Sequence, residues 1–134
     1  MPVESTYDYA IIRVVPRVER GEVINVGVIL SCPAEDFLAA RIEVDPARIH
    51  ALDAAFDLDA ARRHLETIPL ICAGSPQAGP LGQLPQRSRF HWLVAPRSTI
   101  IQTSPVHTGR TSNPAATLER LVSALVRTNG QAPR

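Results

Sequence analysis

The sequence contains no lysine and only two cysteines, and its charge is nearly balanced. All fourteen basic residues are arginine. We attribute this to coding bias, although arginine is also the better bidentate partner for carboxylate or phosphate. The net charge of +1 lacks the basic excess that binding to a nucleic-acid backbone requires. Nucleic acid is therefore not expected as a partner.

Long apolar runs and clustered metal ligands are missing as well. No stretch reaches the roughly 18 apolar residues of a membrane span, and the first residues lack the basic and apolar regions of a signal peptide. A cytoplasmic protein without membrane contact is expected. Cys32 and Cys72 do not form a Cys-x-x-Cys pair, which favours two buried free thiols. We expect neither a metal site nor a cofactor.

The length of 134 residues and the apolar fraction of 45% fit a single domain, residues 1–134, with one continuous core. Residues 74–87 are crowded with proline, glycine, serine and glutamine, which sustain neither helical nor strand periodicity. We predict a flexible loop there, inside the domain rather than at a boundary.

Residues 7–17 and 22–32 are two runs rich in β-branched residues, typical of an antiparallel hairpin. The even positions from Ala10 to Val14 and from Ile24 to Leu30 are uniformly apolar, which predicts that even residues pair with even ones across a three-residue loop. Gly21, the last residue of that loop, should be left-handed. In this register Arg13 lies opposite Gly27, and Val15 lies opposite Asn25.

The rest of the chain predicts one more strand, a helical region, a second hairpin and a last helix. The expected elements are a strand at 37–44, helices at 46–56 and after the cap Asp57, strands at 90–95 and 99–103, and a helix from Asn113 to a cap at Asn129 and Gly130. The order is βββααββα. It predicts an α+β fold, a mainly antiparallel sheet of about five strands with helices packed on one face.

One polar cluster comprises Tyr9, Arg13, Asn25 and Gly27, on the hairpin face that this register turns away from the main core. Gly27 would leave the Arg13 guanidinium room to bind an anion, with Asn25 as a second donor. The alternative is structural and is the default. Arg13 would then pair with an acidic residue of a neighbouring element, and Gly27 would relieve crowding beneath a helix.

A second polar cluster comprises Arg97 and Ser98 with Ser104, His107, Thr108, Gly109 and Arg110, of which Arg97, Ser98, His107 and Thr108 are the binding candidates. These groups can bind a phosphate or supply an acid or base, and histidine titrates near neutral pH. No spacing matches a nucleophile, a base and an orienting residue, so the catalytic residues, if any, are unknown. The default is a turn held by its own serine and threonine hydrogen bonds.

Both clusters fall on segments that carry a resemblance. Residues 7–30, with Tyr-Asp-Tyr-Ala and Arg-Gly-Glu, and residues 97–109, with Ser-Pro-Val-His-Thr-Gly, resemble the signatures of a bacterial family catalogued only as a domain of unknown function. The similarity covers nearly the whole chain and brings no activity or catalytic residue. Members are often encoded beside a kinase similar to the toxin kinases of toxin-antitoxin pairs, which implies a partner or regulator rather than a free-standing enzyme.

Two functions from different classes remain. The first, favoured because no catalytic constellation is recognisable, is a protein-binding or regulatory module that docks through the polar sheet face and the His107 loop, with a kinase as the suspected partner. The second is an enzyme or sensor for a phosphate- or carboxylate-bearing small molecule, and it requires Arg13 and His107 on the same side of the sheet. Homodimerisation through the hairpin face or a strand edge fits either hypothesis.

Overall fold

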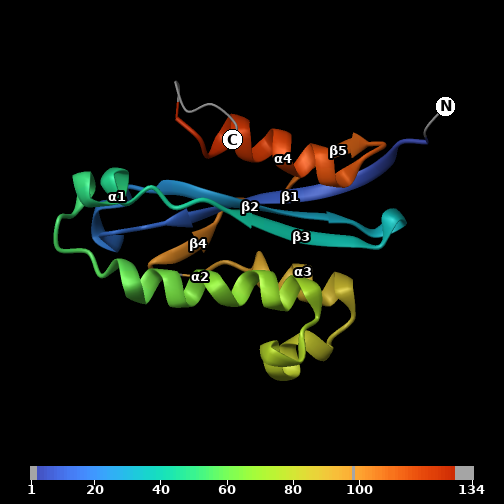
Figure 1. Cartoon of the computed structure of the whole chain (residues 1–134), viewed down its shortest axis with the longest axis horizontal. Coiled ribbons are helices and arrows are strands. Elements are labelled where there is room, and N and C mark those ends of the chain that lie inside the picture. The colour runs from blue at the N-terminus through green and yellow to red at the C-terminus, as the bar shows by residue number, and fades with distance from the viewer. Residues whose placement is uncertain (1–2, 98, 129–134) are drawn as a thin grey trace.

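A five-stranded antiparallel sheet lies between two layers of helix (Figure 1). The computed structural model describes residues 3–97 and 99–128. The strands are β1 (Ser5–Val14), β2 (Ile24–Cys32), β3 (Phe37–Ile42), β4 (Ile101–Thr103) and β5 (His107–Thr111). The helices are α1 (Pro46–Leu52), α2 (Leu58–Ala73), α3 (Gln86–Leu93) and α4 (Pro114–Leu125). The strand order is β3-β2-β1-β4, and β5 also pairs with β1, on the edge that β4 occupies. The predicted α+β class and the five strands are confirmed.

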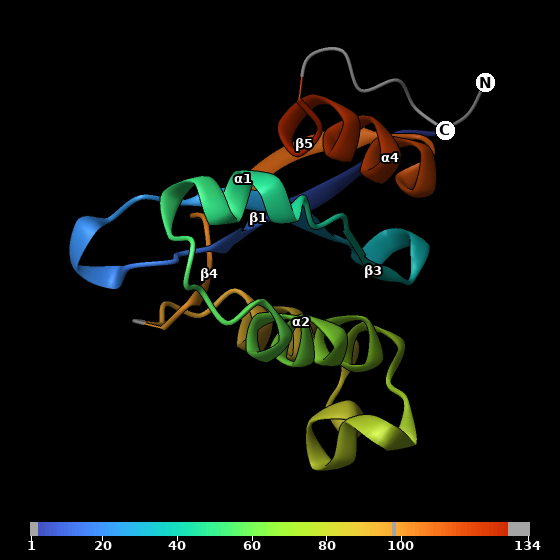
Figure 2. The same ribbon diagram turned by 60° about the vertical axis from the view of Figure 1, so that its left-hand side comes forward.

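The helices cover both faces of the sheet, so the prediction that one face carries them all is wrong. α2 and α3 pack on one face, where Phe90 and Leu65 lie in the core. α4 packs on the other face over β2 and β3, against Val28 and Leu30 (Figures 1 and 2). α1 closes one end, with Ile49 buried in the α2-side core.

The apolar pattern of β2 explains the error. Every residue of β2 from Val26 to Cys32 is buried. A strand covered by helices on both faces needs apolar side chains on both. The apolar residues at even positions predicted a single apolar face of the hairpin. Instead, Ile29 packs toward α2, while Val28 and Leu30 pack toward α4.

The register of the β1–β2 hairpin also differs from the prediction. Ile12 pairs with Gly27, whereas Arg13 pairs with Asn25, so Val26 is an extra residue in a β-bulge. The predicted pairings of Arg13 with Gly27 and of Val15 with Asn25 are therefore wrong. Gly21 is left-handed as predicted, with φ 71°, but it caps the short 3-10 helix Val18–Arg20 in a longer connection.

The predicted helix starts are confirmed by their capping hydrogen bonds. The side chains of Asp45, Asp57 and Asn113 each accept a bond from a backbone amide of the first turn. The predicted end of the last helix, at Asn129 and Gly130, lies outside the described residues.

The second predicted hairpin is largely replaced. Residues 90–95, predicted as a strand, begin inside α3, whose Phe90 and Leu93 enter the core together at helical spacing. The strand predicted at 99–103 is shortened to β4, and β5 occupies a segment that carried no predicted strand. Within the segment predicted as a loop, Pro76–Gln83 forms 3-10 turns. No helix among the described residues is both long and apolar enough to cross a membrane.

Candidate functional site

Four of the predicted site residues lie on the α4 side of the sheet. Successive side chains of a strand point to opposite faces, so Tyr9 and Arg13 share a face. Tyr9 lies opposite His107 of β5, with ring centroids 5.2 Å apart. Arg13 lies opposite Asn25 of β2 and Gln102 of β4. We call Tyr9, Arg13, Asn25, Gln102 and His107 the β1 polar face.

The other predicted residues lie elsewhere. Gly27 pairs with Ile12, on the α2 side of the sheet. Thr108 bonds to Asp8, which lies on that side as well. Arg97 lies in the loop after α3, and Ser98 lies outside the described residues. The structure therefore brings together Tyr9, Arg13 and Asn25 of the first predicted cluster with only His107 of the second.

Gly27 has a packing role that the predicted anion site does not require. A Cβ atom at this position would lie 2.5 Å from the carbonyl oxygen of Arg41 and 3.1 Å from a methyl group of Ile12. The β-bulge brings β3 close to β2 here, and only glycine leaves room for the β3 backbone. Gly27 thus allows two strands to approach and does not lie beside the Arg13 guanidinium.

Arg13 is the unusual member of the β1 polar face. Within residues 3–97 and 99–128 its side chain makes no hydrogen bond or ion pair, and its Nε is buried without an acceptor. The other half-buried arginines of this part of the chain all donate to acceptors: Arg48, Arg87, Arg89, Arg97 and Arg127. The structural alternative, an acidic partner for Arg13, is therefore not found among the described residues.

The side chain across from Arg13 is already engaged by the fold. The Nδ2 of Asn25, directly across from Arg13, donates to the carbonyl oxygen of Leu125 at the end of α4, at 3.0 Å. The carbonyl oxygen of Val126, which follows, accepts from Arg48 at 3.1 Å. Asn25 is thus occupied by the fold, while a buried donor of Arg13 still lacks the acceptor that buried donors normally have.

Thr108 belongs to a polar network that holds four elements together, β5, β1, α3 and β2. Its Oγ1 donates to Asp8 at 2.7 Å. Arg87 of α3 forms an ion pair with the same carboxylate and donates to Ser31 of β2 at 2.8 Å. Burial raises the pKa of the Asp8 carboxyl, but the bonds from Thr108 and Arg87 outweigh burial and hold this pKa below its ordinary value. The network is structural.

The segment around His107 is a strand edge rather than the predicted turn. Ser104 carries the pairing across the break at Pro105, because its amide donates to the Ile11 carbonyl at 2.9 Å and its Oγ accepts from the Ile11 amide at 2.8 Å. Gly109 lies opposite Tyr7, and a Cβ there would lie 2.6 Å from that ring. The only local signal for this strand is the pair of β-branched residues Thr108 and Thr111 near its two ends.

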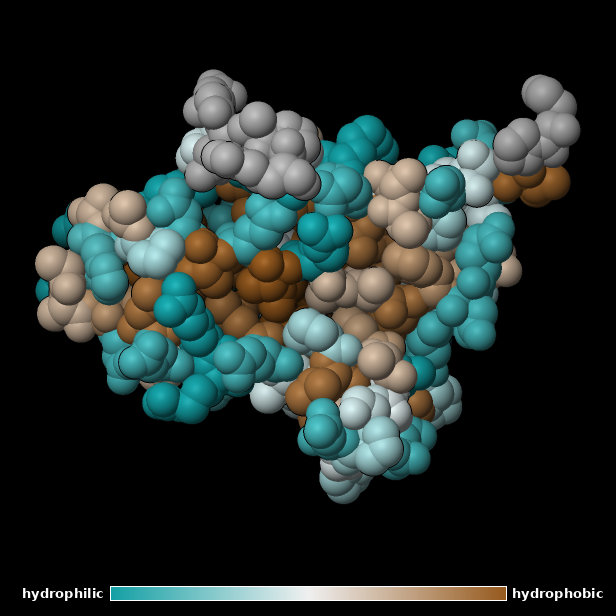
Figure 3. Space-filling model, viewed as in Figure 1, coloured by the Kyte–Doolittle hydropathy of each residue, from teal (hydrophilic) through white to brown (hydrophobic). Residues whose placement is uncertain are grey.

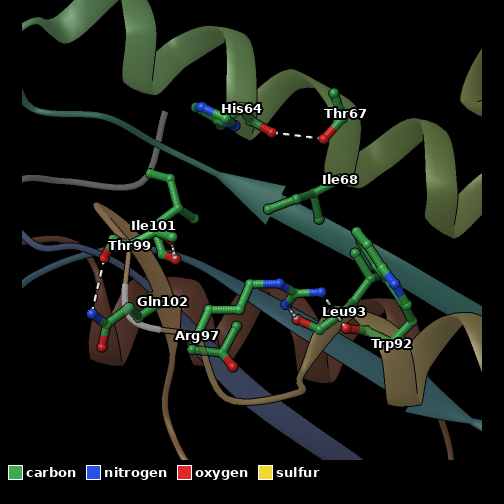
Figure 4. Close-up of a pocket in the computed structure, with 10 residues that line it drawn as sticks. His64, Thr67, Ile68, Trp92, Leu93, Arg97, Thr99, Ile101 and Gln102 are labelled. Atoms are coloured by element: carbon green, nitrogen blue, oxygen red, sulfur yellow. Dashed lines mark hydrogen bonds between the residues drawn. The ribbon is translucent and has the colours of Figure 1, made fainter.

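Arg97 lines a pocket of about 120 Å³ between α2, the end of α3 and β4, to which Gln102 also contributes (Figure 4). Its guanidinium lies 4.3 Å from the ring centroid of Trp92. It donates to the carbonyl oxygens of Trp92, Leu93 and Ala95. His64 of α2 also lines the pocket. Arg97 therefore fixes the end of α3 and does not join Arg13.

An antiparallel sheet between helices defines this chain as an α+β domain, and polar residues follow β1 on one face of the sheet. The chain belongs to the family described as "Protein of unknown function (DUF3037)", whose model matches residues 9–126. This confirms the predicted resemblance. The match runs from β1 beyond the end of α4 and includes the whole β1 polar face. The comparisons found no similar curated protein and no similar solved structure.

Proposed function

We propose that this protein is a binding module that docks a partner protein on the β1 polar face, where Arg13 pairs with a carboxylate of the partner. The carrying observation is the half-buried Arg13, whose Nε has no acceptor in the described part of the chain. A carboxylate would satisfy this donor and neutralise the charge, and arginine forms bidentate bonds with carboxylates.

The spacing along β1 favours a protein segment over a single small anion. Arg13 and Tyr9, with its neighbour His107, lie four residues apart on one face, about 13 Å at the rise of a strand. Ile11 lies between them. One phosphate or carboxylate cannot contact both ends of such a strip, whereas an extended segment can. Tyrosine and arginine are also the residue types that dominate binding energy at protein interfaces.

A kinase is the specific partner that the family resemblance implies, and it is one form of this proposal. The alternative function, an enzyme or sensor for an anionic small molecule, requires Arg13 and His107 on one side of the sheet, and they lie there. This alternative also requires Arg97 in the same site, but Arg97 bonds to the end of α3 instead. Because Arg97 does not lie with Arg13, and the strip along β1 is too long for one small anion, the protein-binding function is supported better.

The test is a selection from a displayed random peptide library against the immobilised full-length protein. Enriched peptides should carry aspartate or glutamate. Arg13→Ala should weaken their binding about tenfold or more, because a hydrogen bond to a charged group contributes about 1.5–3 kcal/mol. Arg120→Ala is the matched control, since Arg120 is exposed on α4 and its removal changes the net charge equally.

Peptides that bind the Arg13→Ala variant as well as the original protein would refute the docking proposal. Mass spectrometry of small molecules that copurify with the protein separates the alternative function, because an anionic metabolite lost only in the Arg13→Ala variant would indicate a sensor or enzyme. Co-expression with the neighbouring kinase, followed by size exclusion, tests the kinase form, which fails if the two proteins elute separately at micromolar concentration.

A further inference from the structure

β3 is an edge strand whose outer backbone groups are unpaired. The amide of Glu43 donates to the carbonyl of Val26 at 2.7 Å, which fixes the alternation of the β2–β3 ladder. The amides and carbonyls of Leu38, Ala40 and Ile42 therefore point away from β2. β3 pairs with no strand other than β2 in the described part of the chain. Such a row of unpaired groups is a template for another strand.

The two edges of the sheet differ in the features that prevent pairing with a further strand. The edge formed by β4 and β5 is short, interrupted at Pro105, and polar at nearly every residue. β3 has six residues with no proline and no bulge, and its one charge, Arg41, pairs with Glu119 at 2.7 Å. Natural edge strands usually carry proline, charge or bulges that prevent pairing. The β3 edge lacks these devices.

An apolar groove runs beside the β3 edge, between β3 and α2. Its cavity has a volume of about 280 Å³ and is lined by Ile42, Val44, Leu65 and Pro69. Figure 3 shows apolar residues on this side of the molecule, between the two helix layers of Figure 1. The groove would receive side chains from whatever strand extends the sheet at β3.

The charges at the groove make it complementary to itself. Arg62 and Glu66 of α2 both line it, both are exposed, and neither forms an ion pair within residues 3–97 and 99–128. A twofold axis perpendicular to the sheet would pair β3 with β3 of a second copy and bring the two α2 helices side by side, antiparallel. With the axis passing between these residues, Arg62 of each copy meets Glu66 of the other.

We propose that a second copy of this chain occupies the β3 edge, joining two sheets into one continuous sheet of ten strands. A second copy is the occupant that fits the charges, because a twofold contact forms the pair of Arg62 and Glu66 twice. The outer groups of β3 supply about six main-chain hydrogen bonds, and the apolar groove is covered by its own symmetry mate. This inference does not depend on the proposed binding function of Arg13.

The test is sedimentation velocity of the full chain across micromolar to submillimolar concentration. The expected species is a dimer of twice the 14.6 kDa chain mass. Arg62→Glu and Glu66→Arg should each weaken dimerisation at least tenfold, because each sets like charges against one another across the axis. The double reversal, Arg62→Glu with Glu66→Arg, should restore it. Arg63→Glu is the matched control, since Arg63 is exposed and does not line the groove.

A second variant tests strand pairing directly. The amide of Ala40 points outward, so Ala40→Pro removes a donor from the edge without breaking a bond to β2, a position where proline is tolerated. Its circular dichroism and Trp92 fluorescence should match those of the original protein while the dimer is lost. A chain that is monomeric at all concentrations overturns the proposal, as does a dimer that Ala40→Pro and the single charge reversals leave intact.

Discussion

Gly27→Ala tests the close approach of β2 and β3 most directly. The added Cβ would lie 2.5 Å from the Arg41 carbonyl oxygen, where ordinary contact begins at 3.4 Å. The nearest atom belongs to the backbone, so no side chain can rotate away to relieve the clash, and β3 itself must move. Overpacking of this kind costs about 1–3 kcal/mol. This movement would also break the hydrogen bond from the Glu43 amide to the Val26 carbonyl, next to Gly27, and destabilise the protein by about 1 kcal/mol more.

The expected loss is therefore about 2–4 kcal/mol in the free energy of unfolding, a large part of the roughly 5–15 kcal/mol typical of a domain. Urea unfolding measures it. Hydrogen exchange locates it, because the Glu43 amide should lose protection while the Ser104 amide, bonded to Ile11 on the far edge of β1, keeps it. A variant within about 0.5 kcal/mol of the original, the spread of ordinary surface substitutions, with the Glu43 amide still protected, would refute this account of Gly27.

Three further outcomes follow from the described contacts. The pKa values of Asp8 and Glu43 are held below their ordinary values, so the stability that these carboxylates contribute is present above about pH 4 and is lost as the pH falls further; Asp8→Asn should flatten the acid limb of a stability-against-pH curve. Arg97→Ala should destabilise the protein by about 1–2 kcal/mol and change the fluorescence of Trp92, the single tryptophan; unchanged emission would contradict their stacking. Burial raises the pKa of the Cys72 thiol to about 12, so a thiol reagent at pH 8 should label it only after unfolding, and rapid labelling of the folded protein would disprove its burial.

Local chemistry made part of the fold predictable. Asp45, Asp57 and Asn113 start helices because their side chains satisfy amides one to three residues away, and Gly21 turns left-handed because it lacks a Cβ. Such signals lie within a few residues of sequence and do not depend on the rest of the chain. They made the helix starts and the left-handed Gly21 predictable, but not the length of the hairpin connection or the pairing of distant segments.

Long-range packing decided the parts that the sequence did not reveal. Residues 90–95 suggested a strand because His91 lies between apolar aromatic residues. Yet Arg89, just before them, donates to the carbonyls of Ile71 and Cys72 and ties this segment to the end of α2 as a helix. The bulge at Val26 is set by both neighbours of β2 and has no local signature. These are cases in which tertiary contacts override local propensity.

The site was half predictable for the same reason. The correct residue types, Tyr9, Arg13 and His107, were visible in two motif segments. Their joining on one face depends on a cross-strand pair between Tyr9 and His107, nearly one hundred residues apart in sequence. The assignment of Thr108 failed because alternate residues of a strand point to opposite faces, and this segment carried no predicted strand. The partner of Asp8 in the fold, Arg87, could not be inferred from spacing.

The two proposals make a joint prediction. A twofold axis perpendicular to the sheet keeps both α4 sides on one side of the ten-stranded sheet, so the two Arg13 residues would face the same way. Their β1 strands would lie about five strand spacings apart, roughly 24 Å. A partner displayed at high density should then bind both sites, and avidity can exceed the single-site affinity by about 10²–10⁴. Ala40→Pro should abolish that gain on a dense surface yet leave the affinity for one peptide in solution unchanged. Arg13→Ala should lose both the avidity gain and the affinity for one peptide in solution. A loss of solution affinity in Ala40→Pro would contradict the separation of the two sites, because the β3 edge would then contribute to the peptide site itself.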